Sequence, residues 1–481
     1  MRKYFWVLTV LSAILLFSPL RTGDLAGYDD AQYAHIAKAI VRTGDWLTLY
    51  SNGYPAMENT PLLEWMQAAL FSVFGFSDAL ARLPSALCGF GTILLVAWLA
   101  RRLTGNPLAA VLAMLVMATS IYFLKYAARA MTDVPFTFFF LCAVCAWSLI
   151  DVDPRWYLAT GVCMALALMT RSLMGLALPA LFALDLAAHR RRPPWRYAIP
   201  SLAIALVPVA VFYANMMHQY GGWFFDVHST WLRNEVYGPL SPSWRRFTGP
   251  FEYAWMMGKS YWPWLPLMIA GAVAVVRGQD RRLWLLLLWG SVVFALCSVT
   301  RSRVLRYMLP AYPAFAILSA LGMLKLVPVH LLRSGLRIAI PVLGLAALVV
   351  AAFPKTHWQA AEIRPIALAA TSATSPGERV AFYDAGQSRF DELNQMQWYG
   401  DRYLNSLNDR ERLLSELRSG RARVCVLDRT TYNTWVAPSI AHQVLASSGH
   451  LVCIRINGSL PVALKSFAVE TSHTPGAFWK Q

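Results

Sequence analysis

The sequence predicts a polytopic α-helical membrane protein of about eleven transmembrane helices that ends in a small α/β domain. Of its 481 residues, 57% are hydrophobic and only 14% are charged. Apolar stretches long enough to cross a bilayer recur along most of the chain. After Pro354 the composition changes, and short strand-like segments follow. These observations predict a membrane part over residues 1–354 and a separate domain over residues 355–481.

Eleven apolar segments are the predicted transmembrane helices. The first is preceded by Arg2 and Lys3 and is not followed by a small-residue cleavage site, which favours an uncleaved span over a signal peptide. The segments cover residues 4–20, 79–99, 108–124, 134–150, 156–170, 172–188, 197–214, 260–276, 283–299, 307–324 and 336–353.

Basic residues predict the orientation of these helices. The net charge of +17 would suit a nucleic-acid partner, but the basic residues gather in short connections such as Arg101-Arg102, Arg190–Arg192 and Arg281-Arg282. The positive-inside rule places such connections in the cytoplasm. The N-terminus is then cytoplasmic, the C-terminal domain is periplasmic, and no nucleic acid is expected as a partner.

The first external loop, residues 21–78, is long and carries two helix signals. Apolar residues from Tyr33 to Val41 follow an amphipathic spacing that Gly44 is suited to end. A second short helix is expected after Pro61. Both are predicted to lie in the membrane interface.

The C-terminal domain is predicted from three strand-like runs and one helix. Residues 379–385, 423–428 and 451–456 are the expected strands, and 409–418 is the expected helix. Cys425 and Cys453 each lie in one of these runs. A disulfide between them is one interpretation, and two separate core cysteines are the favoured one. The other five cysteines lie in predicted spans as buried apolar residues.

Ionisable residues gather at the predicted external ends of the helices. Two adjacent carboxylates, Asp29 and Asp30, open the first amphipathic helix; a capping box of Asp29 with Gln32 is the structural alternative to a catalytic role. Charges at such depth are usually functional. The remaining candidates, each also open to a snorkelling or capping role, are Arg129, Asp133, Arg171, His228, Arg233, Arg301, Arg303, Arg306 and Tyr307.

Seven short motifs occur in order along the membrane part: Asp29–Ala34, Gly44–Trp46, Met57–Leu62, Ala81–Ala86, Ala128–Pro135, Met169–Ser172 and Arg306–Pro313. They resemble the bacterial aminoarabinose transferase family. That family belongs, with the protein O-mannosyltransferases, to the GT-C class of polyprenyl-phosphate-sugar glycosyltransferases. The resemblance covers about three quarters of the chain.

The resemblance implies roles for the candidates. Asp29, Asp30 and Asp133 become the catalytic carboxylates, with Asp29 favoured as the base. The arginines at 129, 171, 233, 301, 303 and 306, with Tyr307, become the donor-phosphate site. Glu58 and His228 resemble a metal-ligand pair, although a backbone-bonded interfacial histidine is the favoured interpretation of His228. A divalent metal is the one cofactor that this implies, and no nucleotide cofactor is expected.

Two departures from the family pattern limit the substrate. The family usually has Arg where this chain has Gln32, and Lys where it has Asn59. In the family that lysine helps to hold the donor phosphate, so in this chain the role passes to arginines elsewhere or is absent. Transfer of aminoarabinose to lipid A is therefore in doubt, while the transferase class is not.

The predicted function is sugar transfer on the outer face of the cytoplasmic membrane. The donor is a polyprenyl-phosphate sugar held among membrane lipids, and the acceptor is lipid A, another glycolipid, a polysaccharide or a protein of the cell envelope. A lipid-linked sugar flippase or other transporter is one alternative, but it would need ionisable residues in mid-span, and almost none occur. A non-catalytic relative is the other.

Overall fold

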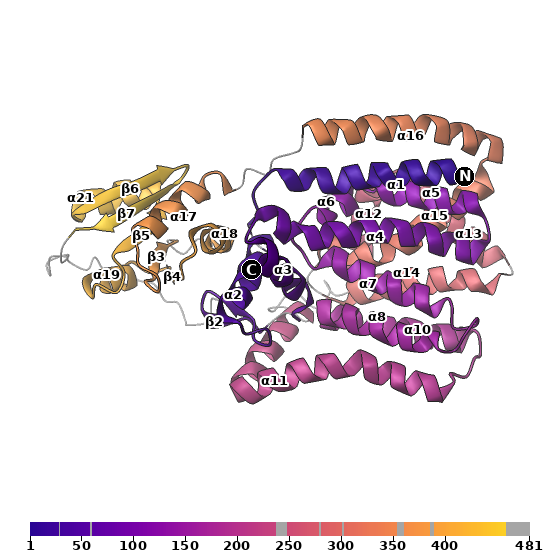
Figure 1. Ribbon diagram of the computed structural model, residues 1–481, viewed down its shortest axis with the longest axis horizontal. Coiled ribbons are helices and arrows are strands. Elements are labelled where there is room, and N and C mark those ends of the chain that lie inside the picture. Colours follow the sequence, from indigo (N-terminus) through magenta and orange to yellow (C-terminus); the bar gives the residue numbers. More distant parts are fainter. Residues whose placement is uncertain are drawn as a thin grey trace. The chain divides into compact units, whose positions relative to one another are not determined.

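A computed structural model describes residues 1–27, 29–57, 60–236, 248–278, 280–300, 303–353, 360–384 and 389–457 (Figure 1). The chain forms two compact units. Unit 1 comprises residues 1–22, 45–48 and 57–355, and unit 2 comprises residues 23–44, 49–56 and 356–481. Unit 2 therefore includes two segments of the first loop, residues 23–44 and 49–56, which the predicted division at residue 354 does not assign to the C-terminal domain.

Unit 1 is helical, and each of the eleven predicted spans falls on helix, which confirms a polytopic membrane protein. Its elements are α1 (Arg2–Phe17), η1 (Ser18–Arg21), α3 (Leu62–Phe74), α4 (Asp78–Thr104), α5 (Pro107–Thr119), α6 (Ile121–Ala127), α7 (Asp133–Trp147), α8 (Trp156–Thr170), α9 (Ser172–Gly175), α10 (Ala177–Ala188), α11 (Trp195–Val236), α12 (Gly249–Ser260), α13 (Trp264–Arg277), η3 (Arg281–Leu283), α14 (Trp284–Val299), η4 (Leu305–Ala311), α15 (Tyr312–Leu326) and α16 (Val329–Ala352).

The helices differ in how clearly they could cross a bilayer. Among the described residues, six are long and apolar enough to do so, and a bent pair, α5 with α6, makes up to seven. The other apolar helices are 10–17 residues long. The predicted span 108–124 is not one straight helix, because α5 and α6 meet at a bend of 66°. The number of spans stays a prediction.

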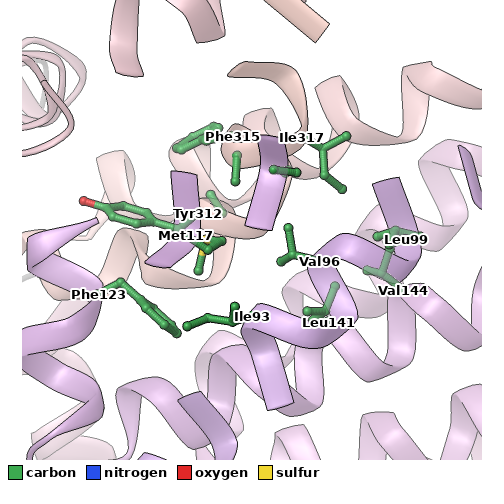
Figure 2. Packing of buried hydrophobic residues seen from close by; sticks show 14 of the residues in the cluster. Ile93, Val96, Leu99, Met117, Phe123, Leu141, Val144, Tyr312, Phe315 and Ile317 are labelled. Carbon is green, nitrogen blue, oxygen red and sulfur yellow. The ribbon is translucent and has the colours of Figure 1, made fainter. Parts of the chain in front are cut away.

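The core of unit 1 lies where α4, α5, α7 and α15 pack together, and Figure 2 shows part of it. Ile93 of α4, Phe123 of α6 and Ile317 of α15 are fully buried there. Small residues permit the closest helix contacts: Gly271 of α13 and Gly322 of α15 have no room for a Cβ, because each faces backbone of the other helix. α11 is interrupted at Gly221, whose φ of 54° suits glycine and ends the straight run of the helix.

Unit 2 contains a five-stranded sheet of order β4-β3-β5-β7-β6. Its strands are β3 (Val380–Tyr383), β4 (Leu404–Leu407), β5 (Val424–Asp428), β6 (His442–Ser448) and β7 (Leu451–Ile456). β4, β3 and β5 run parallel, and β7 and β6 are antiparallel additions. The helical elements that accompany the sheet are α17 (Ile363–Ser372), α18 (Phe390–Gly400), α19 (Arg410–Arg418), α20 (Arg429–Thr431), η6 (Tyr432–Val436) and α21 (Ala437–Ser439).

The three predicted strands and the predicted helix of this domain are confirmed, and β4 and β6 are additions. β4 and β6 are the edge strands, and their residues are less buried than those of β3 and β5. Cys425 pairs in register with Ile454, and Cys453 with Val426. The two cysteines belong to separate hydrophobic clusters, so they point to opposite faces of the sheet. Both are free, buried core residues, as the favoured interpretation has it.

Unit 2 also contains most of the first loop. The amphipathic helix is α2 (Asp29–Thr43), and a hairpin of β1 (Tyr50–Ser51) and β2 (Tyr54–Pro55) follows it. α2 packs against α18, more than three hundred residues away in the chain. Residues around the whole circumference of α2 between Asp30 and Ile40 are buried. α2 is therefore covered by protein on most sides. Its place in the membrane interface stays a prediction.

Candidate active site

Three of the predicted residues meet around one buried carboxylate in unit 1. Asp133 begins α7, and its side chain is 1% exposed. An oxygen of this carboxylate lies 3.4 Å from the nearest guanidinium nitrogen of Arg171 and 3.8 Å from Nε of Arg306. The two arginine side chains are 17% and 15% exposed. A carboxylate and two arginines from three distant parts of the chain thus form one cluster.

Local structure explains why each side chain reaches this point. Asp133 lies in the first turn of α7, where the positive end of the helix dipole favours a carboxylate. Arg171 has an extended backbone between α8 and α9, and its Nε donates to Thr132 Oγ1 at 2.9 Å. Arg306 lies in η4, directly before Tyr307. The Tyr307 ring lies 4.8 Å from the Arg171 guanidinium and 5.7 Å from that of Arg306.

Two guanidinium groups face a single carboxylate in this cluster. Neither oxygen of Asp133 has a hydrogen-bond partner within the described part of the structure, so it holds the arginines by charge rather than by direct hydrogen bonds. Guanidinium groups bind phosphate in a bidentate way and stay charged when partly buried. The cluster is therefore suited to an anion such as a phosphate.

The other predicted phosphate ligands make different contacts. Arg303 forms an ion pair with Glu252 of α12 and donates to Thr248 Oγ1 at 2.6 Å. Arg129 lies over the ring of Tyr126, 5.7 Å from its centroid. Arg233 is exposed near the end of α11. Arg301 lies outside the described residues.

His228 lies in an aromatic pocket after the interruption of α11. Its Nδ1 hydrogen-bonds to the backbone oxygen of Met57 at 2.9 Å, and its ring stacks on Phe224 at 5.5 Å. Tyr213 contacts it edge-on at 5.1 Å. These contacts match the backbone-bonded histidine that the sequence favours. Nε2 has the right chemistry for a metal ligand. Glu58, its predicted partner, lies outside the described residues, and within the described ranges no three His, Cys, Asp or Glu side chains form a metal-binding group.

The adjacent carboxylates Asp29 and Asp30 lie in unit 2. α2 begins at Asp29, so Asp29 is a first-turn residue rather than the capping residue of the predicted capping box. Both acids still benefit from the positive end of the helix. Asp30 is 2% exposed, whereas Asp29 is half-buried. Of the two, Asp29 is the more accessible to another molecule.

Some polar contacts were not predicted from the sequence. Glu252, the partner of Arg303, lies on α12, a helix that was not predicted from the sequence. Lys38 and Arg42 of α2 form ion pairs with Asp401, which follows α18. Their spacing of four residues on one helix face was visible in the sequence, but their partner, some 360 residues away, was not.

Comparisons with known proteins agree with this architecture. Residues 58–218 match the family model described as dolichyl-phosphate-mannose-protein mannosyltransferase. An uncharacterized protein of Aquifex aeolicus is 27% identical over 331 residues, which are 66% of this chain and 64% of that protein. The undecaprenyl phosphate-alpha-4-amino-4-deoxy-L-arabinose arabinosyl transferase of Edwardsiella ictaluri is 26% identical over 335 residues, which are 66% of this chain and 58% of that protein. The match thus spans less than two thirds of either relative's length.

Solved structures show the same fold. ArnT from Cupriavidus metallidurans, bound to undecaprenyl phosphate, superposes with a TM-score of 0.76 over 94% of this chain and 97% of that one, at 18% identity. The oligosaccharyltransferase of Archaeoglobus fulgidus, in complex with Zn and sulfate, superposes with a TM-score of 0.52 over 90% of this chain and 69% of that one, at 13% identity. The likeness to the first extends over nearly the whole of both chains.

Proposed function

We propose, from the premise that this chain is a GT-C membrane protein, that it is a glycosyltransferase that moves a sugar from a polyprenyl-phosphate donor to an acceptor at the outer face of the cytoplasmic membrane. The observation that carries the proposal is the buried group in which the guanidinium groups of Arg171 and Arg306 face the single carboxylate of Asp133. The names of the relatives support the donor class, since they include undecaprenyl-phosphate-dependent transferases and one structure bound to undecaprenyl phosphate.

The chemistry of transfer explains why such a cluster is needed. The bond between the sugar C1 and the donor phosphate oxygen breaks, and a bond from C1 to the acceptor oxygen forms. The phosphate carries one negative charge as a diester and gains a second as it leaves. Fixed cations that face this developing charge stabilise the transition state more than the ground state. Arg171 and Arg306 have that role in our proposal.

Asp133 is then a positioning residue rather than a base. Its carboxylate is buried and lies between two guanidinium groups, so a proton taken from an acceptor would have to displace an ion pair. Its charge instead keeps two arginines together that would otherwise repel each other. Tyr307 contributes a ring face beside Arg171.

The proposed base is Asp29. A hydroxyl acceptor must lose its proton, and a carboxylate can accept it. The exposure of Asp29, compared with the burial of Asp30, supports this order of preference. If the acceptor is itself a phosphate, no strong base is needed, and the carboxylate serves to orient the acceptor.

The sugar and the acceptor are not specified by these residues. Gln32 and Asn59 stand where the aminoarabinose transferases usually carry cations. We therefore propose a donor other than the aminoarabinose lipid, with a glycolipid, glycan or protein of the cell envelope as acceptor. Mass spectrometry of envelope lipids and glycoproteins, with and without the gene, tests this proposal. Identical profiles, together with failure of the purified protein in nanodiscs to bind undecaprenyl phosphate, would overturn it.

Membrane orientation is part of the same proposal. We place the N-terminus in the cytoplasm and residues 355–481 in the periplasm. Reporter fusions at Lys355 and Gln279 are expected to report opposite sides of the membrane. Fusions that report the same side would contradict the proposed orientation.

A further inference from the structure

We propose that the C-terminal α/β domain is the positioning element for α2, with Lys38, Arg42 and Asp401 as the residues that hold the helix. The inference rests on the proposed function, because it concerns the helix that begins with the proposed base, Asp29. It assigns a task to a domain that carries none of the other predicted catalytic residues. All contacts that support it lie within unit 2.

α2 packs against α18, and most residues of α2 are buried. Ile36 and Ile40 of α2 are fully buried, and Lys38 is only 8% exposed. A helix of 15 residues is marginal by itself in water. α2 therefore depends on the surface that covers it, and α18 is part of that surface.

Charges fix this contact at one point. The Lys38 ammonium lies 3.0 Å from a carboxylate oxygen of Asp401 and donates to the backbone oxygen of Trp398 at 3.1 Å. Arg42, one helical turn further on, donates to both carboxylate oxygens of Asp401. Asp401 is the left-handed residue that caps α18, so the two cations meet both a carboxylate and the negative end of a helix.

The hydrogen bonds and charges of Arg42 and Lys38 set the ionisation of Asp401. Burial alone would raise the pKa of this carboxyl, but the hydrogen bond from Arg42 and the charge of Lys38 outweigh it and hold the pKa below its usual range. Asp401 is therefore a carboxylate at neutral pH, and the contact with α2 stays ionic.

The segment before α2 is held as firmly as the helix. The backbone N–H of Leu25 donates to the Tyr399 hydroxyl at 2.8 Å, and its carbonyl accepts from Gln395 Nε2 at 2.9 Å. Gly27 lies so close to Asp391 that a Cβ there would come within 2.5 Å of the Asp391 Cβ. Residues two and four positions before Asp29 are thus fixed to α18 or its first turn.

The hairpin after α2 is joined to the edge of the sheet. Asn52 Nδ2 donates to the Leu404 carbonyl at 2.8 Å, and the Leu404 N–H donates to Asn52 Oδ1 at 2.7 Å. This pair of hydrogen bonds imitates the ladder of an added strand on β4. The chain is therefore attached to the C-terminal domain before α2, along α2 and after it.

Catalysis gives these attachments a consequence. A base must lie within hydrogen-bond reach of the proton that it removes, and a misplacement of about 1 Å can cost on the order of a hundredfold in rate. We infer that the C-terminal domain sets where Asp29 lies, and that damage to this contact lowers transfer without altering the donor-phosphate residues of unit 1.

A charge swap in the full-length protein tests the inference. Asp401→Lys places a third cation beside Lys38 and Arg42, and the double variant Lys38→Asp/Asp401→Lys restores opposite charges. Glu416→Lys is the matched control, since Glu416 pairs with the exposed Arg421 at 3.0 Å on α19. The measurements are amide hydrogen exchange of α2, binding of undecaprenyl phosphate, and the amount of glycosylated product per protein in cells.

The expected result has three parts. Asp401→Lys speeds exchange of α2 amides and lowers product by about tenfold or more, since the contact becomes repulsive. Undecaprenyl phosphate affinity stays unchanged, because its proposed ligands are in unit 1. The double variant recovers both α2 protection and product, and Glu416→Lys resembles the wild type throughout.

Other outcomes separate this inference from the proposed function. Unchanged α2 exchange in Asp401→Lys overturns the inference. If the wild type makes no polyprenyl-dependent product, the proposed function fails. The exchange measurement still decides whether Asp401 holds α2. If β3 and β5 lose protection in Asp401→Lys, the milder Arg42→Ala variant replaces it. That variant is expected to expose α2 selectively, and unchanged α2 protection in it overturns the inference.

Discussion

Two carboxylates in this molecule each lie between two cations, and the two sites differ in how closely they are packed. In unit 1, Asp133 is 1% exposed and lies 3.4 and 3.8 Å from Arg171 and Arg306. In unit 2, Asp401 is 28% exposed and forms direct hydrogen bonds with Arg42 and a 3.0 Å contact with Lys38.

The difference teaches which site can accept a ligand. The cations around Asp401 direct their hydrogens to that carboxylate, so they are suited to join two elements rather than to bind a ligand. Around Asp133 the distances are longer than direct hydrogen bonds, and the carboxylate oxygens have no hydrogen-bond partner in the described part of the chain. An arriving phosphate can therefore gain hydrogen bonds there without first breaking any to Asp133. In our proposals the same charge pattern binds the donor phosphate in unit 1 and holds α2 in unit 2.

The largest expected effect concerns Asp29, at the start of the helix that Asp401 holds in our proposal. Asp29→Asn keeps the size of the side chain and removes the charge, so transfer should fall by about 10²- to 10⁴-fold, the usual contribution of a general base. Hydrogen exchange of α2 should stay near that of the wild type. Loss of activity in Asp30→Asn with retention in Asp29→Asn would reverse the assignment. Activity in both variants would mean that the two carboxylates only stabilise the start of α2, through its helix dipole.

The next prediction tests the cluster of Arg171, Arg306 and Asp133 with substitutions that preserve charge. Arg306→Lys and Arg171→Lys lose the planar fork, so we expect transfer to fall by about 10²- to 10³-fold, as for other lost transition-state donors. Arg303→Lys is the control, because Arg303 is occupied by Glu252 and Thr248. Arg233→Lys reports whether the exposed arginine of α11 also contacts the donor. Turnover is measured as the initial rate with a saturating donor. Normal turnover in all four variants would contradict the proposed stabilisation of the leaving phosphate by arginines.

A smaller effect tests the contact between α2 and Asp401 by a change of pH. Burial, with the charge of Lys38 as the next cause, lowers the pKa of His35 on α2 from 6.5 to about 4, although Asp401 opposes the shift. The unfolded state therefore binds the proton first, so the stabilising contribution is complete above about pH 6.5 and is lost as pH falls toward 4. Between pH 7.5 and pH 5 the loss should be about 2 kcal/mol.

Local stability of α2, measured by hydrogen exchange in nanodiscs, reports this loss. His35→Leu removes the titration and should flatten the pH dependence, whereas His450→Gln, at an exposed histidine of the same unit, should not. Equal pH dependence in the wild type and in His35→Leu would mean that other groups destabilise this contact in acid. Lys38, Arg42 and Asp401 are the charged groups that act on His35.

The fold could be predicted from the sequence where the signal is local. The eleven apolar runs predicted as spans all fall on helix in unit 1. The buried strands β3 and β5 were found because almost all of their residues are apolar. Edge strands β4 and β6 were missed, since their residues alternate less clearly. The interruption of α11 and the bend between α5 and α6 were missed because single residues at Gly221 and Ser120 decide them.

The site could be predicted only as a list of residues. Motif order identified Asp133, Arg171, Arg306 and Tyr307, and the structure brings these four together. Which arginines are already paired could not be predicted, because the partner of Arg303 is Glu252, some fifty residues away on another helix. For the same reason the attachment of α2 to Asp401 was invisible, since nothing local to Lys38 indicates which element covers it.

The smallest expected effect concerns His228, which contrasts with both carboxylate sites because its bond in the structure is to backbone. Its Nδ1 is bound to Met57 and its ring is stacked on Phe224, so the side chain already has a structural task. His228→Ala should therefore lower stability by about 1–3 kcal/mol through the lost hydrogen bond and packing. The rate of transfer per folded protein should change by less than about threefold, which is small beside the loss of a catalytic residue.

His228→Gln is the matched variant, because its amide can reach the Met57 carbonyl without offering an imidazole nitrogen. Addition of EDTA to the wild type should leave the rate unchanged. A rate that falls with EDTA, returns with Zn²⁺ and is low in both His228 variants would show instead that Nε2 binds a metal, and the donor phosphate would then have a cation besides the arginines.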